Sequence, residues 1–261
     1  MTHGIGEVVA LLAAGLAAGT INTVVGSGTL ITFPTLLAFG YSPVLANVTN
    51  TVGLVPGVIS GVHGYRKELT GQRSRLLLLG SACVLGGVTG AILLLTLPAG
   101  AFKAIVPALI GVALVLVVAQ PALARWVALR QAARGGRGEA GRATASGGPV
   151  LWALVFGTGV YGGYFGAAQG VILIGLLGIA FTDTLQRLNA AKNVLAALVN
   201  GVAAVIFIFS THIAWGAAGL IAAGSVLGGQ LGARIGRKLP PAALRGVIVC
   251  VGVIALVRLL A

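Results

Sequence analysis

Residues 15–64 read GLAAGTINTVVGSGTLITFPTLLAFGYSPVLANVTNTVGLVPGVISGVHG, and this stretch decides the fold. An apolar segment ends at Gly26–Thr29, a short apolar segment follows, and a third segment begins after a turn at Gly40–Pro43. The flanks are apolar enough for lipid, where an unpaired backbone amide is costly. Interrupted backbone at membrane depth must be buried in protein or line a cavity. We therefore predict that this stretch forms half of a binding site.

The composition indicates an integral membrane protein. Of the 261 residues, 57% are hydrophobic and 8% are charged, whereas soluble domains carry about 25% charge. The apolar runs are long and do not alternate strictly, which indicates helices and not a membrane barrel. Glycine accounts for 42 residues, far above the usual share of about 7%, and small residues allow helices to pack closely in lipid.

The net charge of +13 comes from 17 Lys and Arg against 4 Asp and Glu. Most cations lie between apolar segments, as the positive-inside rule requires, so we expect no nucleic-acid partner. Cys83 and Cys250 lie inside apolar segments as small hydrophobes, and the three histidines are scattered. We therefore expect no disulfide, metal or cofactor. The opening MTHGIGEVV lacks a positive region and a cleavage site, so we expect the first segment to be retained.

We predict an all-α polytopic membrane protein built from two inverted repeats of five segments each. Residues 1–119 form the first repeat, 120–148 a basic cytoplasmic linker that is a loop or partly disordered, and 149–261 the second repeat. The second segment of each repeat is too short to span about 30 Å of hydrocarbon. The ten segments are roughly 5–25, 29–41, 43–64, 73–97, 101–119, 149–166, 170–182, 184–210, 213–235 and 242–260.

Charge in the connections predicts the orientation. The loop before the fourth segment, the linker and the loop before the tenth segment are basic, which places all three in the cytoplasm and both termini outside. Each group of five segments then crosses the membrane an odd number of times. The second of two consecutive repeats must therefore have the opposite orientation in the membrane. The basic residues are Arg66, Lys67, Arg73 and Arg75, then Arg125, Arg130, Arg134, Arg137 and Arg142, and finally Arg234, Arg237, Lys238 and Arg245.

Weak internal similarity supports the duplication. Residues 26–31 (GSGTLI) parallel 167–172 (AAQGVI), and Thr49-Asn50 falls opposite Lys192-Asn193. Inverted repeats with interrupted helices in matching places are typical of secondary transporters, whose sites lie near the bilayer midplane.

The two glycine-containing turns offer donors for an anion. Thr29 and Gly170 would begin short helices, whose N-terminal N–H groups and dipoles favour negative charge. Ser27 or Thr29 could cap the first helix and also donate to a ligand, and Gln169 could donate in the second turn. If the hairpins enter from opposite faces, their tips meet. The alternative is a pair of ordinary interhelical turns at the surface.

Lys192 is the strongest single candidate, because it lies about two turns inside an apolar helix with no carboxylate nearby. Such a lysine favours an anion that arrives from outside the protein. The alternative is that it extends to the cytoplasmic headgroups, as we expect of Arg187.

Uncharged donors complete the predicted site. Asn22, Asn50 and Asn193 could bind an oxyanion or could form interhelical hydrogen bonds, and Asn47, Asn189 and Asn200 are less specific. Tyr161 and Tyr164 could line the pocket or anchor at the interface. No catalytic residue or metal ligand is predicted. The substrate-binding set is Asn22, Gly26, Ser27, Gly28, Thr29, Thr49, Asn50, Tyr164, Gln169, Gly170, Lys192 and Asn193.

The runs GSGTLITFPTLL (26–37), ANVTNT (46–51) and GAAQGVILI (166–174) resemble the TauE/SafE sulfite exporter family over nearly the whole chain. The resemblance implies export of sulfite, small organosulfonates or other anions. Members commonly have more consecutive glycines in the turns, where this chain has Ser27, Thr29 and Ala167–Gln169, which leaves the substrate open.

These features lead us to expect a transporter of the bacterial inner membrane that exports sulfite or C2–C3 organosulfonates by alternating access. Uniport would suffice, since an interior-negative potential contributes about 2.3 kcal/mol per charge per 100 mV. The partners would be a small anion and the lipid bilayer, with a homodimer left open. The alternatives are an anion-selective channel or a non-transporting assembly subunit. An enzyme is not expected, because no nucleophile, base or metal cluster is present.

Overall fold

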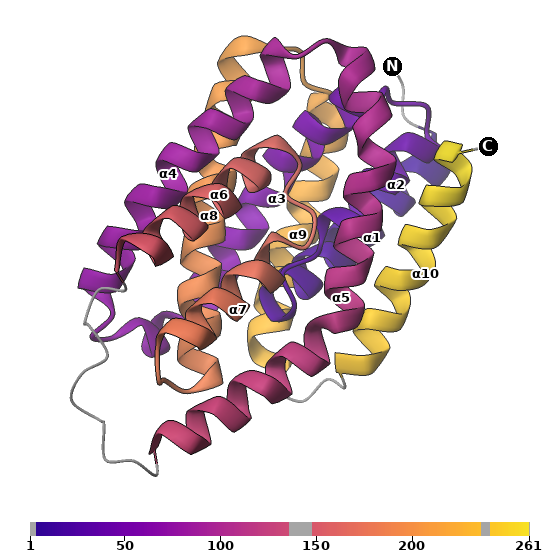
Figure 1. The fold of residues 1–261 in the computed structure, drawn as a ribbon. Helices are drawn as coiled ribbons and strands as arrows, with labels where there is room; N and C mark the ends of the chain where they lie inside the picture. The colour runs from indigo at the N-terminus through magenta and orange to yellow at the C-terminus, as the bar shows by residue number, and fades with distance from the viewer. Residues whose placement is uncertain (1–3, 136–147, 236–240, 261) are drawn as a thin grey trace.

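The computed structural model describes residues 4–135, 148–235 and 241–260, and their secondary structure is helical throughout (Figure 1). The short η1 (Arg66–Leu69) follows the third helix. These residues confirm the predicted all-α class. The α-helices are α1 (Ile5–Val24), α2 (Thr29–Ala38), α3 (Pro43–Gly64), α4 (Arg73–Thr96), α5 (Ala99–Gly135), α6 (Pro149–Tyr164), α7 (Gln169–Ala180), α8 (Leu185–Ser210), α9 (Trp215–Ile235) and α10 (Pro241–Leu260).

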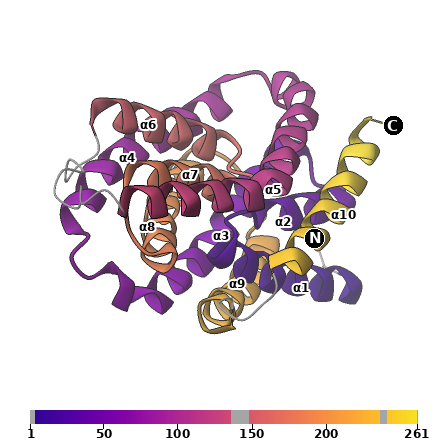
Figure 2. The same cartoon turned by 60° about the horizontal axis from the view of Figure 1, so that its bottom comes forward.

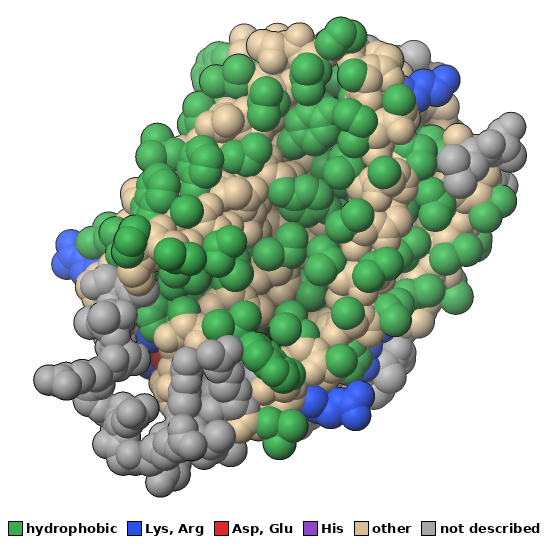
Figure 3. Space-filling view, viewed as in Figure 1, with side chains coloured by type: hydrophobic (Ala, Val, Ile, Leu, Met, Phe, Trp, Pro, Cys, Tyr) green, Lys and Arg blue, Asp and Glu red, His purple; other side chains and the backbone are tan. Residues whose placement is uncertain are grey.

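The helices fall into long and short classes. Among the described residues, six helices (α1, α3, α4, α5, α8 and α9) contain segments long and apolar enough to cross a membrane. The 10 residues of α2 and the 12 of α7 rise only about 15–18 Å, as predicted for the second segment of each repeat. Hydrophobic side chains are spread over the whole face shown in Figure 3, as expected of a multi-pass membrane protein.

The fifth helix is longer than expected. We predicted a loop from Gln120, but α5 continues through Pro121 to Gly135. This part of the prediction is wrong, because the run of Ala, Leu and Arg after Pro121 has high helix propensity. Several charged residues of the linker and of the loop before α10, together with one histidine, lie outside the described residues: His3, Arg137, Glu139, Arg142, Arg237 and Lys238. The division into two repeats and a linker stays a prediction.

Corresponding helices of the two halves make corresponding contacts. Gly228 of α9 packs against the Leu16 carbonyl of α1. In the same way, Gly86 of α4 packs against the Phe156 carbonyl of α6. A Cβ at either glycine would collide with that backbone oxygen. Such close packing of small residues is typical of membrane helices. The matching contacts support the repeat interpretation, and the inverted orientation in a bilayer stays a prediction.

The packing crosses the boundary between the halves. α1 packs on α9, α3 on both α9 and α8, and α4 on both α6 and α8. Figure 2 shows α4, α6, α7 and α8 gathered on the left and α1, α2 and α10 on the right. The first helix of each hairpin, α1 or α6, therefore packs on a spanning helix from the other half, α9 or α4.

The described charges concentrate at helix ends. Asp183, just before α8, pairs with Arg75 at 3.2 Å and Arg187 at 2.8 Å, and the Arg75 guanidinium lies 3.9 Å from the Phe181 ring centroid. Arg187 also donates to the Thr70 carbonyl. We had expected Arg187 to extend to the headgroups. The structure instead pairs it within the protein, because Asp183 lies one helical turn away.

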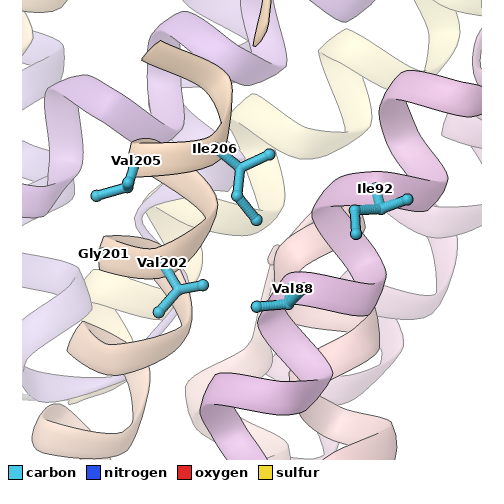
Figure 4. A pocket seen from close by; sticks show the side chains of 6 residues that line it. All are labelled: Val88, Ile92, Gly201, Val202, Val205 and Ile206. Atoms are coloured by element: carbon cyan, nitrogen blue, oxygen red, sulfur yellow. The ribbon is translucent and has the colours of Figure 1, made fainter. Parts of the chain in front are cut away.

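An apolar groove of about 490 Å³ opens between α4 and α8 (Figure 4). Ile92 and Val205, which line the groove, are about half exposed. The groove offers an anion no polar contact, and its surroundings suit a lipid chain. The lining residues are Val88, Ile92, Gly201, Val202, Val205 and Ile206.

Candidate substrate-binding site at the crossing of two helix breaks

The two predicted turns meet inside the protein. We call their contact region the crossing; it comprises residues 25–29, from the α1–α2 connection to the first residue of α2, and 165–170, from the α6–α7 connection to the first two residues of α7. The N–H of Gly170 donates to the Gly26 carbonyl at 3.2 Å. A Cβ on Gly170 would lie 2.5 Å from the Gly26 Cα atom. Both glycines are buried, so the alternative of ordinary surface turns is wrong.

The same backbone device ends α1 and α6. The Ile21 carbonyl accepts the N–H groups of both Val25 and Gly26, and the Tyr161 carbonyl accepts two N–H groups in the same way. Gly26 and Gly166 have φ of 88° and 76°. Glycine adopts this left-handed conformation without steric cost, so the backbone can turn sharply directly after α1 and after α6.

Side chains brace the two turns. The Asn22 Oδ1 atom accepts a hydrogen bond from the Gly28 N–H at 2.8 Å, and the Tyr161 hydroxyl donates to the Ala167 carbonyl. Asn22 is therefore placed at the crossing, where it supports the first turn. The hydroxyl of Tyr161 faces protein, so the interface-anchor alternative does not apply to it.

Two buried donors at the crossing have no protein partner. Ser27 is 1% exposed and Gln169 is 2% exposed, and neither Ser27 Oγ nor Gln169 Nε2 forms a hydrogen bond with the described residues. Ser27 precedes the α2 N-cap, Gly28, and Gln169 is the first residue of α7. We predicted that Ser27 or Thr29 caps α2. That prediction is wrong, because no side chain caps this helix.

Asn50 reaches the crossing from α3. Its Nδ2 atom donates to the Thr29 hydroxyl at 3.4 Å, and its Oδ1 atom accepts from the Thr32 hydroxyl. All three residues are buried. Asn50 and Thr29 therefore lie together in a network that connects α3 to the first turn of α2.

Lys192 lies at the crossing but has partners there. It is 1% exposed, and its Nζ atom donates to the carbonyls of Asn22 at 3.1 Å and Thr23 at 3.3 Å. Extension to the headgroups is therefore wrong, and so is the expectation of a lysine without a protein partner. The last carbonyls of α1 have no helical donors and carry the negative end of its dipole, so the ammonium stabilises that end. A Cβ on Gly170 would lie 3.2 Å from the Lys192 Cδ atom.

Other asparagines bind the same helix ends. Asn189 and Asn193 both donate to the Thr23 carbonyl, at 3.1 and 3.3 Å, and Asn47 donates to the Tyr164 carbonyl of α6 at 2.9 Å. We gave Asn47 and Asn189 little weight. The available signal was their spacing, since each lies three residues before Asn50 or Lys192 and therefore on the same helix face.

Thr49 and Tyr164 contribute differently. The Thr49 hydroxyl accepts from the Ala214 N–H at 3.2 Å, which engages it with the α8–α9 connection and not with the turns. The Tyr164 ring packs edge-on against Phe102, with centroids 5.5 Å apart. Tyr164 thus flanks the crossing, whereas Thr49 supports the start of α9.

The described charges leave the crossing positive. Lys192 is the single charged side chain in the buried set of described residues. The acids Glu7 and Asp183 are engaged elsewhere, Glu7 with the Tyr41 hydroxyl and Asp183 with two arginines. The described residues hold no cluster of three His, Cys, Asp or Glu side chains suited to a metal. Two helix N-termini, a cation and two unpartnered donors therefore meet where no described carboxylate lies.

Comparison with known proteins identifies the family. The sequence profile described as "Sulfite exporter TauE/SafE" matches residues 11–259. The chain is 28% identical over 259 residues to the "Probable membrane transporter protein YfcA" of Escherichia coli K12, covering 94% of this chain and 86% of that protein. It is also 28% identical to a "Probable membrane transporter protein" of Haemophilus influenzae, covering 90% and 87%. No solved structure matches significantly. The profile covers both halves and the crossing, and the chain is thus a multi-pass membrane protein of the TauE/SafE sulfite exporter family.

Proposed function

We propose that this protein is a membrane transporter that carries small anions and binds them at the crossing. The observation that supports this most directly is the pair of unpartnered donors, Ser27 Oγ and Gln169 Nε2, beside the N-terminal ends of α2 and α7. A buried donor without a partner lowers stability, so one such donor at each helix break favours a ligand that accepts hydrogen bonds.

The chemistry of the crossing suits an oxyanion. A sulfite or sulfonate group presents several acceptor oxygens, and a hydroxyl, an amide and helix N-terminal N–H groups are suitable donors. The Lys192 ammonium adds positive charge while it holds the end of α1. The family description and the printed names of the relatives agree with transport, and we extend them to sulfite and C2–C3 organosulfonates.

The arrangement of the hairpins supports alternating access. The α1–α2 and α6–α7 hairpins touch at Gly26 and Gly170, and the hydrogen bond between them joins the two groups of helices. Rocking of one group against the other would expose the crossing to one side at a time. Export of an anion needs no further coupling, because an interior-negative potential already drives it outward.

Flux in proteoliposomes tests this proposal. Wild-type protein should carry labelled sulfite or 2-aminoethanesulfonate with saturation and with counterflow, whereas a channel would show neither. Replacement of Ser27 by Ala together with Gln169 by Leu should raise KM at least tenfold, since each charge-assisted hydrogen bond contributes about 1.5–3 kcal/mol. Unchanged KM in this double variant would refute the site.

Lys192→Met provides a second test of the site. The variant removes the charge and keeps the length of the side chain, so we expect lower affinity for the anion. Asn200→Ala is the matched control in the same helix, because among the described residues Asn200 donates only to the Ala196 carbonyl, one turn away. Equal flux in the Lys192 variant and in this control would show that Lys192 serves α1 alone.

A further inference from the structure

Four helix ends and one lysine determine the electrostatics of the crossing. Helices α1 and α6 end there, and helices α2 and α7 begin there. A helix carries about half a positive charge at its N-terminus and about half a negative charge at its C-terminus. The two positive ends and the two negative ends therefore offset one another, and the backbone contributes almost no net charge to the crossing.

Lys192 supplies the remaining charge. It is the single charged side chain among the buried residues that the structure describes, so no buried acid among these residues offsets it. Its Nζ atom is held by the Asn22 and Thr23 carbonyls, 3.1 and 3.3 Å away. The same side chain packs against Gly170 of α7, where a Cβ would lie 3.2 Å from the Lys192 Cδ atom. The crossing therefore carries one net positive charge.

The position that matches Lys192 in the first half of the chain is uncharged. Asn189 and Asn47 donate to the C-terminal ends of α1 and α6, respectively, and Lys192 and Asn50 each follow three residues later. Asn50 is 1% exposed, and its amide is hydrogen-bonded to α2. A lysine at both matching positions would have given the crossing two positive charges. The asparagine therefore limits the charge that a ligand meets.

A buried site with one positive charge distinguishes anions by their charge. The free-energy cost of moving an ion out of water rises with the square of its charge, so a dianion costs about four times as much as a monoanion of the same size. The attraction of the dianion to a single cation only doubles. A bound dianion would also leave one uncompensated negative charge in the buried site, whereas a bound monoanion leaves none.

We propose that the crossing selects anionic groups that carry a single negative charge, and that residues 50 and 192 determine this selectivity. The inference rests on the proposed anion site and specifies the class of its ligand. A sulfonate group and hydrogen sulfite meet the requirement, whereas sulfate and the sulfite dianion do not. Asn50 is then a specificity-determining residue, because it keeps a second positive charge out of the crossing.

Three tetrahedral sulfur compounds of similar size test this selectivity. Dimethyl sulfone, methanesulfonate and sulfate carry no charge, one negative charge and two negative charges at neutral pH. The rise in Tm of the purified full-length protein would be titrated with each compound in an excess of choline chloride, because a ligand that binds the folded state stabilises it. For wild type, the concentration at half-maximal stabilisation should be at least tenfold lower for methanesulfonate than for the other two compounds.

The failure of this proposal can be distinguished from the failure of the anion site. Sulfate binding as tightly as methanesulfonate would overturn the selectivity and leave the anion site standing. Dimethyl sulfone binding as tightly as methanesulfonate, or no response to any of the three compounds, would refute the anion site and this inference with it.

Two variants should shift the preferred charge in opposite directions. Lys192→Met removes the positive charge and keeps the length of the side chain, so methanesulfonate should lose its advantage over dimethyl sulfone. Asn50→Lys adds a second positive charge, so sulfate should gain at least tenfold in affinity relative to methanesulfonate. The Tm of Asn50→Lys without any anion should be lower than that of wild type, because the added ammonium has no buried counter-charge among the described residues.

Asn200→Lys is the matched control for the added charge. Asn200 lies about 12 Å further along α8 than Lys192, and among the described residues it donates only to the Ala196 carbonyl. Its order of preference among the three compounds should equal that of wild type. Equal changes in Asn50→Lys and Asn200→Lys, or an unchanged order in Lys192→Met, would refute the assignment. If Asn50→Lys does not fold, Lys192→Met decides the question alone.

Discussion

A methyl group at Gly170 should separate the two halves of the crossing. In Gly170→Ala, the added Cβ would lie 2.5 Å from the Gly26 Cα atom and 3.1 Å from the Gly26 carbonyl oxygen. Ordinary contact distances are 3.4–4 Å, and both obstacles are backbone atoms that cannot rotate away. The turns must therefore part by about 1 Å, as the difference from normal carbon contact requires. The Gly170 N–H to Gly26 carbonyl hydrogen bond, 3.2 Å long, would then be lost.

The loss of folding stability caused by Gly170→Ala can be estimated from two contributions. Overpacking costs about 1–3 kcal/mol. A buried N–H left without its acceptor costs about 1–3 kcal/mol more. We expect a destabilisation of about 2–5 kcal/mol and a Tm lower by roughly 5–15 °C. Flux should fall as well, because the donors of α2 and α7 no longer face one ligand.

The assay is thermal unfolding of wild type, Gly170→Ala and the control Gly201→Ala, followed by flux. Gly201 is also helical, but a Cβ there meets no atom within 4 Å. Its replacement should leave Tm unchanged or raise it, since alanine favours helix by about 0.5–1 kcal/mol. A Tm for Gly170→Ala within about 2 °C of the control would mean that the turns do not touch.

Three further outcomes follow from contacts described above. Ser27→Ala should bind the anion more weakly yet unfold at an equal or higher temperature, because it removes an unpartnered buried hydroxyl; a lower Tm would show that this hydroxyl has a structural partner. Asp183→Asn should lower stability by about 1–3 kcal/mol in denaturant titrations, since it breaks two partly buried ion pairs, and an unchanged midpoint would contradict this. Burial, with a smaller contribution from Glu7, raises the pKa of Tyr41, in the α2–α3 connection, to about 12. The raised pKa stabilises the folded protein below pH 10, and this stabilisation is lost as the pH approaches 12. The free energy of unfolding of Tyr41→Phe should therefore fall less steeply than that of wild type at alkaline pH. An equally steep fall in both proteins would exclude Tyr41 as its source.

The two helix breaks were predictable from sequence for a physical reason. Glycine next to hydroxyl and amide residues inside an apolar run is costly in lipid unless the backbone is buried in protein, so 26–29 and 167–170 stood out. The short lengths of α2 and α7 also follow from composition alone. A meeting of the two turns was predicted only for hairpins that enter from opposite faces, and the direction of entry stays a prediction.

The partners of the candidate site residues could not be predicted. Lys192 lacks a nearby carboxylate in sequence, and its acceptors are the Asn22 and Thr23 carbonyls, brought close only by tertiary packing. The hydrogen bond from the Ala214 N–H to Thr49 depends in the same way on where α9 begins. Helix α5 was cut short in our prediction because the basic, Gly/Ala-rich composition after Gln120 suggested a loop, whereas local helix propensity prevailed.

The packing of α1 on α9 and of α6 on α4 has a consequence for how the chain can be divided into fragments. Because α9 completes the surface around α1, and α4 completes the surface around α6, a fragment that stops in the central linker would leave glycine-lined faces without their covering helix. Neither fragment could then fold alone. Two fragments produced in the same cell would need to associate before either became resistant to proteolysis. Folding in the membrane would therefore be complete only after the last helices are inserted, because the α1–α2 hairpin cannot pack stably before α9 is present.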